Sequence, residues 1–413
     1  MRFLLIILFL PFFSPAQTVV QQISKAESEL FIFKKKEDSI LLKLEDLKFQ
    51  KIHQDLDQTG LPKLVSGEEV VYHSAFALVY SEKYEQAKWV AHIILPDVVK
   101  GNEGRSNDFR PDDKIRTGSA VEADYFLKKI RPDSTFVYDA FGYDRGHLAP
   151  SADFRYSKKA LSESFLYSNM SPQLAKLNRG KWAELEDVIR QYAVRNNIQL
   201  YIVSGGVLKP GLKKIERGIN KVSIPDQYYK VVLDLANQRA IGFIMPNMEC
   251  EYPVMHYAVN IDSVEAVTGL DFFYNLPDDM ENSVENSIDI SKWTEAKDLG
   301  DVLPLRADSL PGNTFNSVQA KYYMGKNENI RVCGTVVSTK LSSKGNIFIN
   351  LDKKFPNQIF SISIFKDQVP NFSYQPELFL AGKTICVTGK VTNYNGVPGV
   401  SIGSEKFIEI LGE

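Results

Sequence analysis

Apolar side chains recur at helical spacing along residues 17–62, a stretch that is otherwise rich in Lys and Glu. The positions that carry this pattern are Ile40, Leu41, Leu44, Leu47, Ile52 and Leu56. Leu61 and Pro62 interrupt the spacing and predict the end of the helical segment. Two alternatives remain: a helix or helical pair that lies against the next domain or projects from it, and a coiled-coil partner helix.

Apolar and polar residues alternate along residues 69–95, and this alternation predicts two strands joined by a short polar turn. Residues 200–206 form an apolar run that ends in two glycines, which predicts a buried strand. Residues 228–235 and 240–245 predict two further strands, again with a polar turn between them.

Two helical patterns occupy residues 156–194 and are separated by Pro172. Strands and helices therefore mix without the regular alternation that is typical of a parallel α/β fold. We predict an α+β domain with a mixed or antiparallel sheet over residues 63–300.

Residues 301–318 are rich in Asp, Pro, Gly, Asn and Ser and are predicted to form a linker. Five short strand-like segments follow, at residues 330–337, 346–351, 359–365, 383–392 and 397–402. Helical signal is scarce there, so residues 319–413 are predicted to form a small all-β barrel that resembles an OB-fold. Such barrels commonly bind single strands or oligosaccharides, but a fold alone does not establish a ligand.

The composition changes this picture little. A chain of 413 residues favours two domains, and 44% hydrophobic with 24% charged residues is typical of a globular protein. The formal net charge of −2 argues against a large basic surface for nucleic acid, while a local basic cleft stays compatible with it.

The first residues have the pattern of a secretory signal. Arg2 precedes an apolar run over residues 3–13, and small residues at 14–16 suit a cleavage site. We therefore predict a signal peptide over residues 1–16 and a periplasmic or secreted protein; a retained membrane anchor is the alternative. No other segment has the length of a membrane-spanning helix, so no span is expected after cleavage.

The chain has three cysteines, at positions 250, 333 and 386. Cys333 and Cys386 lie in strand-like segments and are expected to form a disulfide if those two strands are neighbours. No Cys and His pattern suggests a zinc site.

The strongest chemical signal is the run of Asp144, Arg145, Gly146 and His147. Histidine has a pKa near neutrality, so its neutral ring can accept a proton from water at working pH. Arginine offers a fork of donors that suits a phosphate, and glycine permits close backbone approach. A histidine without such neighbours is more often a structural core residue.

A second group of polar residues follows about thirty positions later. It comprises a Ser-Asn-Met-Ser-Pro-Gln run at residues 168–173, then Asn178, and Glu186 eight residues further on. Together with the Asp-Arg-Gly-His run, these blocks resemble the DNA/RNA non-specific endonucleases of the ββα-metal superfamily, to which endonuclease G is similar. The resemblance covers about residues 70–290.

The resemblance implies that His147 is the general base of phosphodiester hydrolysis. It implies that Asn178 is the one direct protein ligand of a divalent metal, Mg²⁺ with Mn²⁺ as a substitute, although a helix cap is an alternative role for Asn178. Glu186 lies about two helical turns after Asn178 and matches the acid that holds metal-bound water in the family. A solvent-facing helix charge is its alternative.

Four further residues receive roles from the same resemblance. Arg145 is expected to stabilise charge near the phosphate, and Asp144 to orient its neighbours. Arg105 is our choice for the upstream arginine that contacts the phosphate, with Arg110 as its rival. Asn169 is expected near the substrate, and scaffolding is its alternative.

The combined prediction is an exported, Mg²⁺-dependent endonuclease that cleaves DNA and RNA and leaves 5′-phosphate ends, with a homodimer as an expectation from the family. The competing hypothesis is a non-catalytic nucleic-acid-binding protein of the cell envelope that uses the OB-like module.

Overall fold

The computed structural model describes residues 18–96, 98, 101, 103–138, 142–294, 300–342 and 345–411. The predicted signal peptide lies outside the described residues. The chain divides into two compact units, Met1–Lys51 and Ile52–Glu413.

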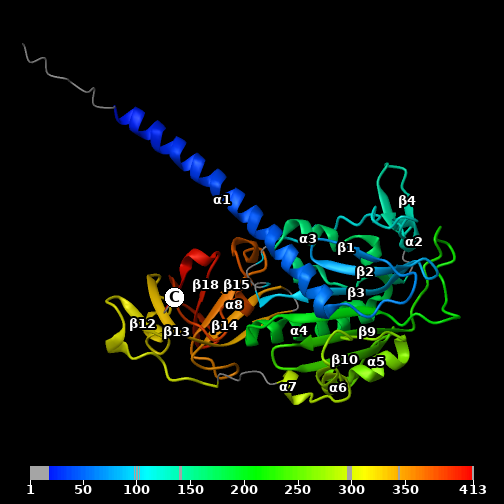
Figure 1. Ribbon diagram of the computed structural model, residues 1–413. Helices are drawn as coiled ribbons and strands as arrows, with labels where there is room; N and C mark the ends of the chain where they lie inside the picture. The colour runs from blue at the N-terminus through cyan, green and yellow to red at the C-terminus, as the bar shows by residue number, and fades with distance from the viewer. Residues whose placement is uncertain are drawn as a thin grey trace, which may run out of the picture. The chain divides into compact units, whose positions relative to one another are not determined.

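One long helix dominates the first unit. Helix α1 spans Val19–Asp55 and is the long dark-blue helix in Figure 1. It confirms the predicted helical character, as one helix and not a pair. Its exposed apolar residues are Val19, Val20, Ile23, Leu30, Phe31, Ile32, Phe33, Ile40, Leu41, Leu42, Leu44 and Leu47. None of the helices in the described part of the chain is long and apolar enough to cross a membrane.

A seven-stranded sheet forms the centre of the second unit, in the order β1-β2-β3-β8-β9-β10-β11. Its strands are β1 (Val70–Tyr72), β2 (Phe76–Ser81), β3 (Gln86–Ile94), β8 (Leu200–Gly206), β9 (Gln227–Asp234), β10 (Arg239–Pro246) and β11 (Ala258–Val259). Every neighbouring pair is antiparallel, which confirms the α+β prediction with an antiparallel sheet.

The first predicted strand is in fact two strands, β1 and β2, joined by a tight turn. The backbone N–H of His73 donates to the carbonyl of Phe76 at 2.8 Å and closes this turn. The His73 ring is buried and lies 2.9 Å from the Asp112 carboxylate. The chain therefore reverses next to a buried polar contact, a feature that alternation alone does not show.

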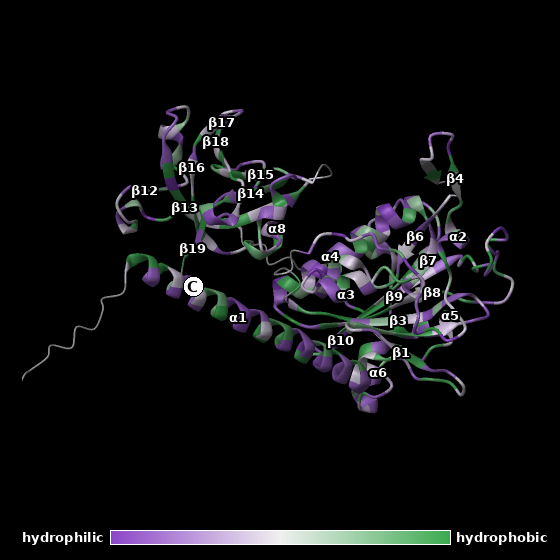
Figure 2. Ribbon diagram, turned by 90° about the horizontal axis from the view of Figure 1, so that it is seen from above, coloured by the Kyte–Doolittle hydropathy of each residue, from purple (hydrophilic) through white to green (hydrophobic). Residues whose placement is uncertain are grey.

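Alternation along β9 separates the two faces of the sheet. Lys230 lies over the ring of Trp182, next to helix α4 (Ala183–Asn196). Tyr229 points to the opposite face and contacts Phe272, which follows helix α5 (Ile261–Thr268). Figure 2 shows α4 on one side of the sheet and helix α6, Asp278–Glu285, on the other.

A two-stranded hairpin followed by a helix lies on the α4 face. Strands β6 (Tyr143–His147) and β7 (Met170–Leu174) pair antiparallel, and a π-helical turn, Leu177–Trp182, leads into α4. Pro172 lies between the helices α3 (Lys158–Glu163) and α4, as predicted, but it belongs to β7, where it faces Arg145. A strand with one open edge tolerates a residue that cannot donate a hydrogen bond. The other α-helices and strands before the C-terminal region are α2 (Glu122–Tyr125), β4 (Lys128–Ile130), β5 (Phe136–Tyr138) and α7 (Ser291–Thr294).

The C-terminal region is all-β except for the short helix α8 (Pro376–Phe379) and several single turns. Its strands are β12 (Thr314–Asn316), β13 (Asn329–Leu341), β14 (Ile347–Leu351), β15 (Ser361–Ile364), β16 (Thr384–Lys390), β17 (Thr392–Tyr394), β18 (Val397–Ser401) and β19 (Ile408–Ile410). All five predicted strand segments are confirmed. The hydrogen-bonded order β17-β18-β15-β14-β13-β16-β19 does not close on itself within the described residues, so the OB-like barrel stays a prediction.

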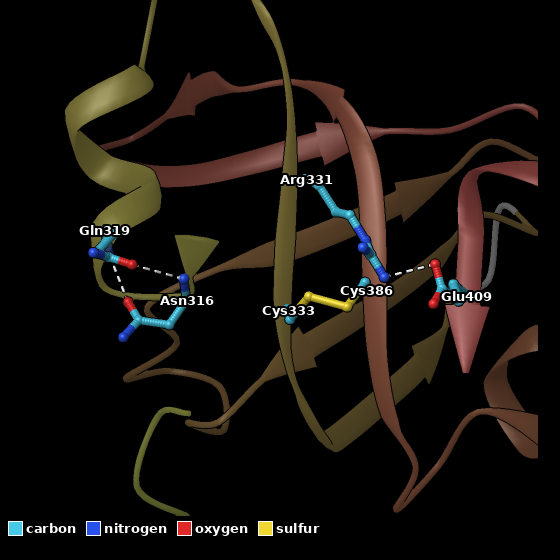
Figure 3. The surroundings of a disulfide bond; sticks show 6 residues. All are labelled: Asn316, Gln319, Arg331, Cys333, Cys386 and Glu409. Atoms are coloured by element: carbon cyan, nitrogen blue, oxygen red, sulfur yellow. Dashed lines mark hydrogen bonds and ion pairs between the residues drawn. A yellow bond between two sulfur atoms is a disulfide. The ribbon is translucent and has the colours of Figure 1, made fainter. Parts of the chain in front are cut away.

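A disulfide joins two neighbouring strands of this region. Cys333 on β13 faces Cys386 on β16 in the antiparallel register, and Figure 3 shows the bond between them. The pairing that the sequence left open is therefore present. The predicted linker contains one strand, β12, which pairs with β13 just beside Cys333.

Candidate active site

One pocket of about 510 Å³ opens at the hairpin and helix that follow the Asp-Arg-Gly-His run. Its lining residues are Arg105, Asn107, Phe109, Phe126, Asp144, Arg145, His147, Pro150, Ser151, Ala152, Asn178, Arg179, Ala183 and Glu186. All five residues predicted to be catalytic, and the predicted metal ligand, lie in this set. The structure therefore brings together side chains from positions that are up to 81 residues apart (186 minus 105).

His147 ends strand β6 and is held by aromatic rings. Its ring meets Phe165 edge-on with the ring centroids 4.9 Å apart, and Phe109 lies 5.9 Å away. The residue is 8% exposed, and its Nε2 has no hydrogen-bond partner among the described residues. A buried ring nitrogen without a partner is a costly arrangement unless a ligand supplies one.

The environment of His147 keeps its ring neutral. Burial, together with the nearby Arg105 and Arg145 guanidinium groups, lowers the pKa of His147 to about 3. Burial disfavours the imidazolium, and the two cations repel it. The ring is therefore unprotonated throughout the neutral range, and its nitrogen lone pair is free of a proton.

The same shift predicts how stability changes with pH. The unfolded chain binds a proton at His147 near pH 6.5, whereas the folded chain does so near pH 3, so stability falls as pH drops through this window. We expect the free energy of unfolding of the wild type to fall by about 2 kcal/mol more than that of His147→Gln between pH 8 and pH 5. Urea unfolding at several pH values measures this difference. Equal pH slopes for the two proteins would contradict it.

Two arginines converge on the pocket. The Arg145 guanidinium carbon lies 3.5 Å from the centroid of the Phe109 ring and 4.9 Å from that of Phe126. Arg105 lies over Phe165 at 5.2 Å and donates from Nε to Asn107 at 2.7 Å. Stacking on aromatic faces holds the planar guanidinium groups in place.

Gly146 separates Arg145 from His147 and has a steric reason to be glycine. A Cβ at this position would lie 2.2 Å from the Gln173 side chain on the paired strand. A larger residue at this position would force the buried Gln173 side chain to move.

Asp144 organises the residues that begin the next helix. It accepts two hydrogen bonds from Arg179, at 2.7 and 2.6 Å, and one from the Asn178 side-chain amide at 2.9 Å. This last bond is the only side-chain hydrogen bond of Asn178 among the described residues, so its amide oxygen stays available to a ligand. The predicted orienting role of Asp144 agrees with this geometry.

Glu186 lies in the first part of α4 and faces the pocket. Burial raises the pKa of Glu186, while Lys230 and Arg190 act in the opposite direction. Arg190 is one helical turn further on, on the same face of α4, and donates to the buried Asp153 at 2.8 Å. Asp153 also lies 3.0 Å from Nε2 of His92 on β3, so this charged chain attaches α4 to the sheet.

Lys230 supports the site from the central sheet. Its buried ammonium group donates to the Ser204 hydroxyl at 2.6 Å and to the carbonyl of Leu148 at 3.4 Å. Leu148 directly follows His147, so Lys230 binds the backbone one residue after the proposed base.

Two predicted substrate contacts lie elsewhere. The Arg110 guanidinium bonds Asp108 and the carbonyl of Ser162, and it does not line the pocket, which favours Arg105 over its rival. Asn169 is fully buried, accepts from the N–H of Ala149, and donates to that residue's carbonyl and to Ser164. This placement corresponds to the scaffolding alternative, since its hydrogen bonds hold the turn after His147.

Several side chains of the site were not singled out from the sequence. They are Phe109, Phe126, Asp153, Arg179, Arg190 and Lys230. Arg179 stood beside Asn178, and Arg190 stood one turn after Glu186, so helical spacing offered a signal for both. A lysine within an apolar strand was the signal for Lys230, because an unpaired lysine is almost never fully buried.

The chain is similar in sequence to known nucleases. The model of the DNA/RNA non-specific endonuclease family matches residues 53–279. A nuclease of Nostoc sp. is 32% identical over 241 residues, which cover 55% of this chain and 81% of that protein. Mitochondrial endonuclease G of Bos taurus is 29% identical over 237 residues, which cover 54% and 74%. A crystal structure of an EndoG/EndoGI complex matches with a TM-score of 0.46 and 26% identity, covering 54% of this chain and 92% of that one.

The family match ends at residue 279 and leaves the C-terminal all-β region outside it. It nevertheless includes every residue that lines the pocket and spans more than half of the 413 residues. The chain therefore belongs to the family of DNA/RNA non-specific endonucleases and is an endonuclease.

Proposed function

We propose that this protein is an exported, metal-dependent endonuclease that hydrolyses DNA and RNA, with His147 as general base and Asn178 as metal ligand. The observation that carries the proposal is the neutral, unpartnered Nε2 of His147 in one pocket with two arginines, an available amide oxygen and a carboxylate. These are the groups that phosphodiester hydrolysis requires.

The residues of the pocket fit a hard divalent cation. Asn178 presents an amide oxygen, and Glu186 adds a carboxylate that has no hydrogen-bond partner among the described side chains. Oxygen ligands of this kind suit Mg²⁺, which usually keeps several of its waters, and Mn²⁺ accepts the same ligands. When bound, such an ion stabilises negative charge on the phosphoryl oxygens and on the departing 3′ oxygen.

His147 supplies the base. Its Nε2 takes a proton from the attacking water, and the resulting imidazolium is destabilised by burial and by both arginines, so it releases that proton readily. Arg105 and Arg145 bind non-bridging phosphate oxygens from their positions on the aromatic rings. Glu186 orients water within the same pocket.

The substrate class follows from the character of these contacts. Arginine, histidine and carboxamide groups at the pocket engage the sugar–phosphate backbone and do not read base edges. We infer cleavage of both DNA and RNA with weak sequence preference and 5′-phosphate products.

Export is part of the proposal. It rests on the signal-like pattern of residues 1–16 and on the Cys333–Cys386 disulfide, which is typical of an oxidising compartment. Fractionation of cells that produce the protein tests it: activity in the periplasm or the medium supports export, and activity confined to the cytoplasm contradicts it.

The decisive assay is digestion of plasmid DNA and of RNA by the mature chain, with Mg²⁺ and with EDTA. We expect both substrates to be degraded only in the presence of the metal. Intact substrates under every divalent metal, with binding retained, would support the nucleic-acid-binding hypothesis instead.

Asn178→Ala should separate metal binding from folding. Because the variant lacks the proposed ligand, we expect the cleavage rate at fixed Mg²⁺ to fall by about 10²- to 10³-fold. A Mg²⁺ titration of the rate measures the change. Asn282→Ala, at an exposed position of α6, is the matched control and should behave like the wild type. An unchanged Mg²⁺ dependence in Asn178→Ala would exclude this residue as the ligand.

A further inference from the structure

Three carboxylates meet on the face of the central sheet that is opposite the nuclease pocket. Asp262 and Glu265 lie three residues apart on α5, and Glu285 is the last residue of α6. One carboxylate oxygen from each lies within 4.8 Å of the others. Helix α5 packs so closely on β10 that a Cβ at Gly242 would lie 2.6 Å from Val264. The packing therefore holds α5 close to the sheet.

Glu285 is the unusual member of this group. It is 8% exposed, and its Oε1 has no hydrogen-bond partner in the described part of the chain. It also ends a helix, where the helix dipole disfavours a negative charge. A buried carboxylate oxygen without a partner costs substantial free energy, so this atom points to a ligand that would satisfy it.

The surrounding charges increase this cost. Burial, and then the charges of Glu265, Glu281 and Asp262, raise the pKa of Glu285 to about 8. Among the described residues, no lysine or arginine forms an ion pair with any of the three carboxylates. Lys63, which interacts with the neighbouring Glu281, pairs with Asp271 at 2.8 Å.

One member of the group is already oriented toward the others. Glu265 accepts a hydrogen bond at Oε1 from the N–H of Phe272 at 2.7 Å, which fixes its side chain and leaves the second oxygen available. Asp262 makes no such bond among the described residues. The cluster thus offers several carboxylate oxygens to a cation and no positive group.

We propose that Asp262, Glu265 and Glu285 form a binding site for a divalent cation, Ca²⁺ in the first instance, that joins α5 to α6. Ca²⁺ takes oxygen ligands at about 2.3–2.6 Å, so two ligands on opposite sides of the ion lie roughly 4.6–5.2 Å apart. One oxygen of each carboxylate lies within 4.8 Å of the other two, so a single ion can contact all three. Three carboxylates suit Ca²⁺, which takes six to eight oxygen ligands, whereas Mg²⁺ usually keeps several waters and is bound by one or two carboxylates. The site is independent of the proposed nuclease chemistry.

Thermal unfolding of the full chain with Ca²⁺ tests the proposal. An Asn178→Ala background removes the proposed catalytic ligand, so a shift that remains there arises elsewhere. We expect Ca²⁺ at roughly 100-fold above its Kd to raise Tm by about 3–8 °C. Glu285→Gln and Asp262→Asn should each abolish the rise, whereas Asp279→Asn, an exposed acid of α6, should retain it.

The metal-free protein supplies a second readout. Glu285→Gln removes a carboxyl group whose charged form is disfavoured in the metal-free fold, so we expect its Tm without Ca²⁺ to equal or exceed that of the wild type. A Ca²⁺ shift that disappears in Asn178→Ala and persists in Glu285→Gln would assign the ion to the nuclease pocket and overturn the proposal. Absence of any shift with Ca²⁺, Mn²⁺ or Mg²⁺ would also overturn it and would leave Glu285 as a protonated core residue. If Glu285→Gln does not fold, Asp262→Asn gives the same test.

Discussion

His147→Ala is expected to lower the cleavage of DNA and RNA by at least about 10³-fold while leaving the fold intact. The pocket contains no second neutral base with an unpartnered ring nitrogen, within the residues that the structure describes. Loss of a general base typically costs about 10²- to 10⁴-fold in rate. Initial rates on plasmid DNA, measured at saturating Mg²⁺, give the comparison.

A matched variant controls for the substitution itself. His256→Ala removes an exposed histidine that stacks on Tyr252, and this variant should keep wild-type activity. Binding of a phosphodiester analogue by His147→Ala should persist, because Arg105 and Arg145 remain in the pocket. Equal rates for the wild type and His147→Ala would refute the assignment of the base.

Asp153→Ala is expected to lower the free energy of unfolding by about 3–5 kcal/mol. Its carboxylate is 2% exposed and bonds both Arg190, at 2.8 Å, and His92, at 3.0 Å. Removing it leaves the Arg190 charge buried without this partner, and the folded state bears the cost of that charge. Since all three tryptophans lie between residues 89 and 293, tryptophan fluorescence during urea unfolding follows this part of the chain.

Asp187 provides the matched control for this variant. It contacts the same Arg190 at 2.8 Å, but its side chain is 52% exposed. Asp187→Ala should therefore cost less than about 1 kcal/mol. Similar losses for the two variants would show that the buried chain from His92 to Arg190 does not stabilise α4.

Periodicity predicted the strands of the central sheet and of the C-terminal region well. The run of residues 200–206 coincides with β8, and the C-terminal strand segments agree with the structure within a few residues. These strands are buried on one or both faces, so burial and sequence pattern are directly linked. The same reasoning missed β6 and β7, whose residues serve the pocket and carry no alternating pattern.

The site could be predicted where chemistry is encoded in a short run of residues. Asp144, Arg145 and His147 are contiguous in sequence, and all three line the pocket. The upstream arginine was harder to assign, because Arg105 and Arg110 lie in one stretch and only the folded chain shows which one enters the pocket. Asn169 was predicted to lie near the substrate, but its hydrogen bonds correspond to the scaffolding alternative. A polar residue beside a motif suits either role, so the sequence alone does not distinguish them.

By itself, the sequence determined the family, the residues that line the pocket, and the α+β and all-β character of the two regions, because these depend on local residue order and on alternation. Only the tertiary structure decided which ionisable groups are charged and which buried polar atoms have hydrogen-bond partners. The low pKa of His147, the buried Asp153–Arg190 pair and the unpartnered oxygen of Glu285 all arise from segments distant in sequence. Desolvation and charge interactions depend on distances through space, which residue order does not specify.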